Sequence, residues 1–371
     1  MKWLQNGNLA KLVAFFVIAV VITCTVSFAA NGWQSFINEP SSDKITTDDV
    51  AVNNKIDQND VEKNEEDIPA IQPADKFYHL LTGLETDLET SLKRPVCVCV
   101  DSSTPLYGIS SSYLTIEFPT EYGNTRFLCF TDDAKSLGKL GSLAPSRGYI
   151  SNLATYFGGV LLSYGTDDTF EYAHNTPTGI LDFKATTGYC YTEYNSLVYT
   201  NGDLVNAFMN NSGVNQGATD PINLPYIFTD AEDVFVPDGK DAFNVAVTFS
   251  DISSSLLTYS EADRAYILTK SASLKNDLLN DKALAYNNVF ILYANATTHE
   301  TESNTQLIVD TYTNGTGVYI SMGKQVDISW EKDASGNFVF YNSNGEKLEI
   351  NRGTSYIAFA KASEKASVKI S

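Results

Sequence analysis

Residues 94–100, RPVCVCV, form the stretch that most clearly decides the fold of this 371-residue chain. The run is almost entirely apolar, which is typical of a strand buried on both faces. Because side chains alternate between the faces of a strand, Cys97 and Cys99 are expected to point to the same face. Two more apolar segments, at 110–118 and 125–131, predict neighbouring strands.

Beyond these strands the spacing of the apolar residues changes. Within 146–157 they recur at helical intervals, which predicts a helix with one buried face. The apolar run GVLLSY then predicts another strand, and 203–211 predicts a second short helix. Strands that are joined through helices indicate a mixed α/β unit.

The second half of the sequence favours β structure. Alternating or apolar segments at 242–249, 288–294 and 325–332 predict strands, and the middle one is apolar enough to be central. Asn344 and Gly345 predict a hairpin turn, because both residue types tolerate positive φ. We therefore predict a mainly antiparallel unit that ends in a meander, which makes the expected fold class α+β.

Residues 12–30, LVAFFVIAVVITCTVSFAA, are long and apolar enough to span a bilayer as a helix. Lysines on the N-terminal side predict that this end stays in the cytoplasm and that the later residues are exported. The segment has three interpretations: an uncleaved anchor helix, a signal peptide cut after Ala29, or a signal whose Cys24 carries a lipid. The expected localisation is the cell membrane, with the soluble part extracytoplasmic.

A polar and acidic segment follows the apolar one. It has too few apolar residues to offset its ordering entropy, so it is expected to be a flexible spacer. The predicted organisation is a membrane anchor or signal segment at 1–30, an acidic spacer at 31–77, an α/β domain at 78–224, a β-rich domain at 225–361 and a frayed tail at 362–371.

The composition limits the function classes. A formal net charge of −20 excludes a general nucleic-acid binder, which needs a basic face. The 3 histidines are far apart and show no ligand spacing, so a zinc site is not expected. We predict no metal and no cofactor. Spacing alone leaves open whether Cys97 or Cys99 pairs with Cys129 or whether all are small core residues.

Candidate polar side chains gather near the end of the second predicted strand. Glu117 and Glu121 flank that end and could form an acid/base pair, or they could be solvated loop carboxylates. Arg126 at a strand start and Arg147 at a helix start could together bind a carboxylate or phosphate. The alternative is that these arginines form ion pairs with the same two glutamates.

The order of motifs resembles the YerB-like lipoprotein family of Gram-positive bacteria. The segments that carry the resemblance are LTGLETDLE, RPVCVCV, EYGNTRFLCFT, GSLAPSRGYISNLA, NSLVYTNGDLV and the C-terminal run from GTGVYIS to SYIAF. The similarity spans roughly 80–360. It implies an α/β N-terminal part, a β-rich C-terminal part and a domain of unknown function in the cell envelope.

The resemblance adds Asn195 and Tyr199 to the candidate polar site, because they lie in the stretch that matches the family's His-Asn-Leu-Tyr motif. The chain departs from the family pattern at Ala144, where relatives have an arginine, and at Tyr194, where they have a histidine. If those polar residues form a site in relatives, this chain has lost part of it.

These observations predict a membrane-tethered extracytoplasmic domain that binds a cell-wall component or wall-synthesis protein without catalysis. The alternative is an enzyme acting on wall polymers through Glu117 or Glu121, together with Arg126 and Arg147. The sequence contains no complete serine catalytic motif, which favours the binding function.

Overall fold

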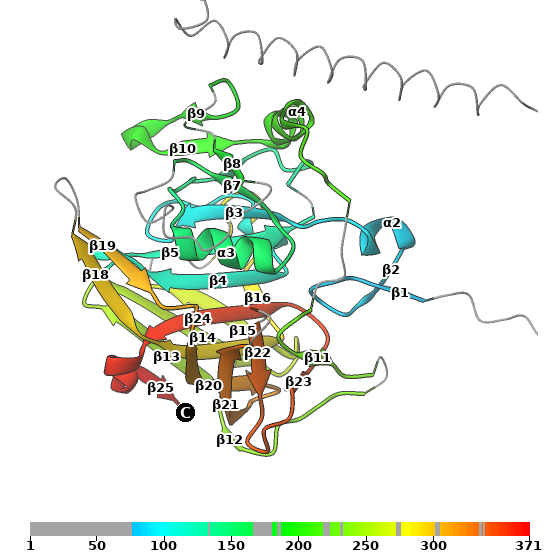
Figure 1. Cartoon of the computed structure of the whole chain (residues 1–371), viewed down its shortest axis with the longest axis vertical. Coiled ribbons are helices and arrows are strands. Elements are labelled where there is room, and N and C mark those ends of the chain that lie inside the picture. The colour runs from blue at the N-terminus through cyan, green and yellow to red at the C-terminus, as the bar shows by residue number, and fades with distance from the viewer. Residues whose placement is uncertain are drawn as a thin grey trace, which may run out of the picture. The chain divides into compact units, whose positions relative to one another are not determined.

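A computed structural model gives the fold and describes residues 76–132, 134–165, 180–182, 184, 187–217, 223–230, 233–271, 276–300, 305–333, 336 and 338–371. The predicted anchor, Cys24 and nearly all of the predicted spacer lie outside these residues. The described part is mostly β and falls within one compact unit, Gln72–Ser371 (Figure 1).

A large mixed sheet forms the centre of this unit, and within the described residues it has 11 strands. In spatial order they are β12 (Lys240–Asp241), β21 (Lys324–Lys332), β20 (Asn314–Ser321), β17 (Asn288–Ala294), β24 (Ser355–Lys361), β4 (Leu114–Pro119), β5 (Thr125–Thr131), β3 (Val96–Asp101), β7 (Val160–Ser163) and β8 (Ile180–Asp182), with β22 (Phe338–Tyr341) paired to β21. Strands from both sides of the predicted boundary at 224 are therefore neighbours in one continuous sheet.

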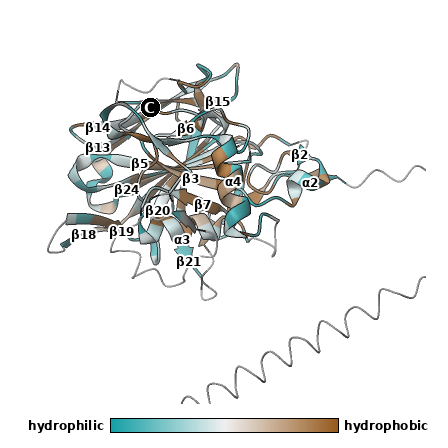
Figure 2. Cartoon of the chain, turned by 90° about the horizontal axis from the view of Figure 1, so that it is seen from above, coloured by the Kyte–Doolittle hydropathy of each residue, from teal (hydrophilic) through white to brown (hydrophobic). Residues whose placement is uncertain are grey.

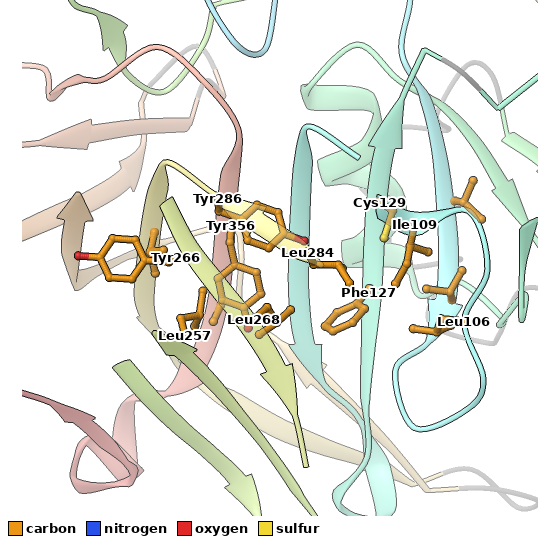
Figure 3. Close-up of a cluster of buried hydrophobic side chains, with 14 of the residues drawn as sticks. Leu106, Ile109, Phe127, Cys129, Leu257, Tyr266, Leu268, Leu284, Tyr286 and Tyr356 are labelled. Atoms are coloured by element: carbon orange, nitrogen blue, oxygen red, sulfur yellow. The ribbon is translucent and has the colours of Figure 1, made fainter. Parts of the chain in front are cut away.

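A second sheet covers one face of the large sheet. Its strands, in order, are β16 (Leu284–Tyr286), β15 (Ala265–Lys270), β14 (Ser253–Ser260), β13 (Asn244–Ser250) and β25 (Val368–Ile370). Inward-facing residues alternate with exposed ones along β13 and β14, as expected for strands with one face on a core. Leu257, Leu268 and Tyr286 of this sheet pack with Phe127 and Tyr356 of the large sheet (Figure 3).

The opposite face of the large sheet packs in part against helix α3 (Gly148–Tyr156), whose Ile150 and Leu153 are buried. Helix α4 (Gly202–Ser212) begins at Asn201, whose side chain accepts a hydrogen bond from the Leu204 backbone N–H at 3.0 Å. It ends at Gly213, which has a left-handed φ of 66°. Figure 2 shows α4 apolar on one side and polar on the other, as its spacing predicts.

The remaining elements are short. They are β1 (Phe77–Tyr78), β2 (Glu85–Thr86), α2 (Leu88–Ser91), β6 (Leu140–Gly141), β9 (Tyr191–Thr192), β10 (Val198–Thr200), β11 (Ile227–Phe228), β18 (Ala296–Glu300), β19 (Thr305–Val309), β23 (Glu349–Ile350) and the 3₁₀ turns η3 (Ile109–Ser111), η4 (Glu121–Gly123), η6 (Tyr194–Ser196) and η7 (Ala362–Ser367). Strands β18 and β19 form a hairpin, and β6, β9 and β10 form a small separate sheet.

Two features of the C-terminal region differ from the prediction. Strand β24 does not close an antiparallel meander, because it lies between β17 and β4 and is parallel to both. Six of its seven residues are buried, which is the pattern of a strand covered on both faces. The tail does not fray either, because β25 pairs with β13 and Ser371 exchanges two backbone hydrogen bonds with Asn244.

Cys97, Cys99 and Cys129 are buried, and among the described residues they form no disulfide. Cys97 and Cys99 share one face of β3, as predicted, and face the core that contains α3. Cys129 on β5 belongs to the core on the opposite side of the sheet, so neither pairing with it can form. Burial raises the pKa of Cys129 to about 12, which leaves little of the reactive thiolate near neutral pH.

Candidate functional site

The clearest site lies where β4 ends and the chain turns through η4 into β5. A pocket of about 240 Å³ opens there. It is lined by Pro119, Thr120, Glu121, Tyr122, Gly123, Asn124, Phe249, Ser250, Thr298, Thr305, Gln306, Leu307 and Lys361. These residues come from the β4–β5 turn, the end of β13, the β18–β19 hairpin and the end of β24, so segments far apart in the sequence build the pocket together.

Glu121 joins this pocket to the two predicted arginines. Its Oε1 accepts a hydrogen bond from Arg147 Nη2 and lies 3.7 Å from Arg126 Nη2. Arg126 is held from its other side, because its Nη1 donates to the Pro145 carbonyl oxygen at 2.9 Å. The structure therefore places Arg126, Arg147 and Glu121 in one cluster, and the arginines bind a carboxylate of the protein itself.

The second oxygen of the same carboxylate has a different environment from the first. Glu121 Oε2 is buried and has no hydrogen-bond partner within the described residues. The same is true of Oε1 of Gln306, whose side chain is only 2% exposed and lines the same pocket. Buried polar atoms are nearly always hydrogen-bonded, so two unsatisfied acceptors on one pocket mark a place where a donor can bind.

Glu117 has a different environment, although it is only four residues from Glu121. It is fully buried between the two sheets. Its Oε1 accepts from Lys270 Nζ at 2.6 Å and from Thr125 Oγ1 at 2.5 Å. Its Oε2 accepts from Ser255 Oγ at 2.7 Å and from the Tyr356 hydroxyl. The carboxylate is thus fully hydrogen-bonded and out of reach of a ligand.

The groups around Glu117 depend on one another. Lys270 is 2% exposed and also donates to Ser253 Oγ at 2.7 Å. Burial first, and then the charge of Glu117, raises the pKa of Tyr356 well above its usual value. The tyrosine therefore stays protonated as a donor to Glu117. A buried ion pair that is satisfied on all sides is a structural unit, and breaking it is costly.

The other two predicted site residues lie elsewhere. Tyr199 on β10 is 2% exposed, and its ring packs edge-on against Tyr107 at a centroid distance of 5.6 Å. Lys139 Nζ lies 4.0 Å from both ring centroids, which is cation–π packing. Asn195 is exposed in η6 with a left-handed φ of 61°. The lining of the pocket includes neither predicted residue.

A half-buried pair that the sequence does not indicate lies near the N-terminal end of the described residues. His79 Nε2 lies 3.0 Å from Asp132 Oδ2, and its Nδ1 accepts from the Thr82 backbone N–H at 3.2 Å. Thr82 Oγ1 is 3.1 Å from the same nitrogen, which gives a threonine–histidine–aspartate row. Thr82 is only 5% exposed and its hydroxyl accepts from the Leu84 N–H, so this row fixes a turn.

The comparisons with known proteins identify the family. Residues 81–215 match the N-terminal domain, and residues 245–357 the C-terminal domain, of a family described as "Protein of unknown function (DUF3048)". The chain belongs to this family. The predicted resemblance to YerB-like proteins is confirmed. The two matched parts of this DUF3048 chain are separated by residues 216–244, a segment that contains the predicted domain boundary.

One relative from Bacillus subtilis, YerB, matches this DUF3048 protein along most of its length in both sequence and structure. A protein named "Putative lipoprotein YerB" (strain 168) is 24% identical over 281 residues, which cover 72% of this chain and 81% of the relative. The crystal structure of YerB protein superposes with a TM-score of 0.66 at 20% identity, over 80% of this chain and all of that one. The superposition shows a shared fold.

In the part of the chain that the structure describes, no helix is both long and apolar enough to cross a bilayer. The apolar segment 12–30 lies outside that part.

Proposed function

We propose that this protein is a membrane-tethered extracytoplasmic domain that binds a cell-wall component or an envelope partner without transforming it. The pocket at the end of β4 is the binding site. The single observation that carries the proposal is Glu121, which lines the pocket with one oxygen held by arginines and the other buried and unsatisfied. The apolar N-terminal segment and the relative named as a lipoprotein support the location outside the membrane.

The same geometry argues for binding over catalysis. Hydrolysis of glycans normally requires two carboxyl groups that flank the bond to be broken. Among the described residues that line the pocket, Glu121 is the only carboxylic acid. Glu117, the second acid of the enzyme alternative, is fully buried under four donors. Within the part of the chain that the structure describes, the pocket can therefore hold a ligand but lacks the paired acids for this reaction.

Site-directed photocrosslinking in intact cells tests this function. A photoreactive phenylalanine analogue is placed at Tyr122, which is 74% exposed on the pocket, in the full-length protein. We expect a high-mass adduct after illumination. Digestion with a glycan-cleaving enzyme or with protease then shows whether the adduct contains wall polymer or a protein partner.

The matched control places the analogue at Phe243, an aromatic residue that is 49% exposed and does not line the pocket. Position 243 should give little or no adduct at the same expression level. Absence of an adduct at position 122, or equal adducts at both positions, would contradict binding at this pocket. Release of sugar fragments from purified wall by the full-length protein would contradict the non-catalytic part.

A further inference from the structure

We infer that the pocket binds one uncharged sugar unit that carries hydroxyl and amide groups, such as an N-acetylated sugar of a glycan chain. The inference rests on the proposed function and names its ligand class. It follows from three properties of the pocket: the kind of hydrogen-bonding atoms left unsatisfied, the charge balance around them, and the aromatic residue exposed beside them.

The unsatisfied atoms call for a ligand with hydrogen-bond donors. Glu121 Oε2 is an acceptor only, and it is buried without a partner in the described chain. Gln306 is 2% exposed, and its amide end can offer an oxygen or a nitrogen to a ligand once the group rotates. A sugar hydroxyl or an acetamido N–H can donate to the carboxylate, and the same sugar can both donate to and accept from the amide.

The charges around the pocket favour an uncharged ligand. The carboxylate of Glu121 already lies beside the guanidinium groups of Arg126 and Arg147, so its negative charge is compensated within the protein. Lys361, which also lines the pocket, is neutralised by Glu364 at 3.0 Å. An ammonium group at Glu121 would bring a further positive charge close to these two guanidinium groups, which is unfavourable. An anion would have to place its oxygens beside the unsatisfied oxygen of Glu121, so a neutral donor fits best.

The shape and the walls of the pocket suit a sugar ring. Tyr122 is 74% exposed at the pocket, in a left-handed conformation with φ of 60° that few non-glycine residues adopt. An exposed aromatic face can stack on the apolar face of a sugar. Thr298 and Thr305 add hydroxyl groups to the lining. The volume of about 240 Å³ equals roughly eight water molecules, which is enough for one ring and too small for a folded partner.

Calorimetric titration of the full-length protein tests the inference. The protein is kept in micelles of a zwitterionic detergent without a sugar head group, and it is titrated with the N-acetylglucosamine tetramer and with its deacetylated, cationic form. We expect the acetylated tetramer to bind and the cationic one to bind at least about tenfold more weakly.

Two variants locate the binding. Tyr122→Gly removes the ring while placing a residue that accepts the positive φ, and Gln306→Leu removes the amide. Each should weaken binding of the acetylated tetramer at least about tenfold, whereas Phe243→Ala should leave binding unchanged. Because the glycine relieves backbone strain, lost binding in Tyr122→Gly with an undiminished melting temperature cannot come from misfolding.

The outcomes separate the ligand class from the proposed function. Tighter binding of the cationic tetramer, or binding that neither variant weakens, overturns the inference. If the acetylated tetramer fails to bind while crosslinking at position 122 still gives an adduct, the sugar is wrong and the binding function stands. If both experiments fail, the pocket is not a binding site.

Discussion

Two glutamates at the same end of β4 show how the same residue type can serve structure or binding. Glu117 is fully buried, and each of its oxygens has two donors. Glu121 is 12% exposed, with one oxygen beside two arginines and the other unsatisfied on a pocket. The difference is the completeness of hydrogen bonding: a fully satisfied carboxylate stabilises the fold, and a half-satisfied one can still accept a bond from a ligand.

Substitution of Lys270 is expected to give the largest effect and tests whether Glu117 stabilises the fold. Replacing it with Met leaves the carboxylate of Glu117 buried without its counter-charge. We expect the free energy of unfolding to fall by about 3–5 kcal/mol. Urea denaturation of the full-length protein in detergent, followed by circular dichroism, measures this change.

Lys324→Met is the matched control, because Lys324 forms an ion pair of the same 2.6 Å length with Asp241 while its side chain is 37% exposed. That substitution should change the stability by at most about 1 kcal/mol. The double substitution Glu117→Leu with Lys270→Met should recover part of the loss, because it removes both charges. Equal effects of the two single lysine substitutions would mean that burial does not distinguish the pairs.

Tyr356→Phe is a smaller change in the same buried network, and it tests how much one hydrogen bond to Glu117 contributes to stability. It removes one donor from Glu117, and hydrogen bonds to charged groups contribute about 1.5–3 kcal/mol, so we expect a loss of that size near neutral pH. Binding at the pocket should be unaffected, because Tyr356 does not line it.

The pH dependence of this variant follows from the raised pKa of Tyr356 in the folded state. The unfolded tyrosine ionises near pH 10, whereas the folded one keeps its proton, so its contribution is complete below pH 10 and declines above it. Tyr319, whose pKa burial raises to about 12, adds to the same alkaline loss. Denaturation between pH 8 and 12 should show a shallower decline in Tyr356→Phe than in the wild type, and an identical decline would contradict the assignment.

Gln306→Leu is expected to have the smallest effect on stability, and in the opposite direction. Removing a buried acceptor that has no partner relieves a desolvation penalty, so the free energy of unfolding should stay constant or rise by up to about 1 kcal/mol. The same variant should lose binding of the acetylated tetramer. A loss of more than about 1 kcal/mol in thermal or urea denaturation would show that Gln306 serves the fold.

Much of the secondary structure follows from local sequence patterns. The predicted strand at 125–131 coincides with β5, the one at 288–294 coincides with β17, and the helix predicted within 146–157 contains α3. These segments have strong period-two, continuous or helical spacing of apolar residues, and such spacing depends only on neighbours along the chain. The parallel position of β24 had no such signal, because strand partners are set by contacts far along the sequence.

The candidate site could be predicted only in part. The sequence placed Glu121, Arg126 and Arg147 near strand and helix ends, and these three come together. It could not separate Glu121 from Glu117, because two of the four donors to Glu117, Ser255 and Tyr356, lie 138 and 239 residues away in the chain. Gln306 had no distinguishing pattern, since its burial depends on the β18–β19 hairpin meeting the end of β4.

The sequence by itself determined the kinds of elements in this protein, their approximate bounds, its acidic charge and the apolar N-terminal segment, because these are properties of composition and of neighbouring residues. The tertiary structure decided which strands share the large sheet and that the C-terminal tail pairs with β13. It also decided which glutamate is fully hydrogen-bonded and which keeps one unsatisfied oxygen. Those outcomes depend on burial and on hydrogen bonds between distant segments, which exist only once the two sheets have packed together.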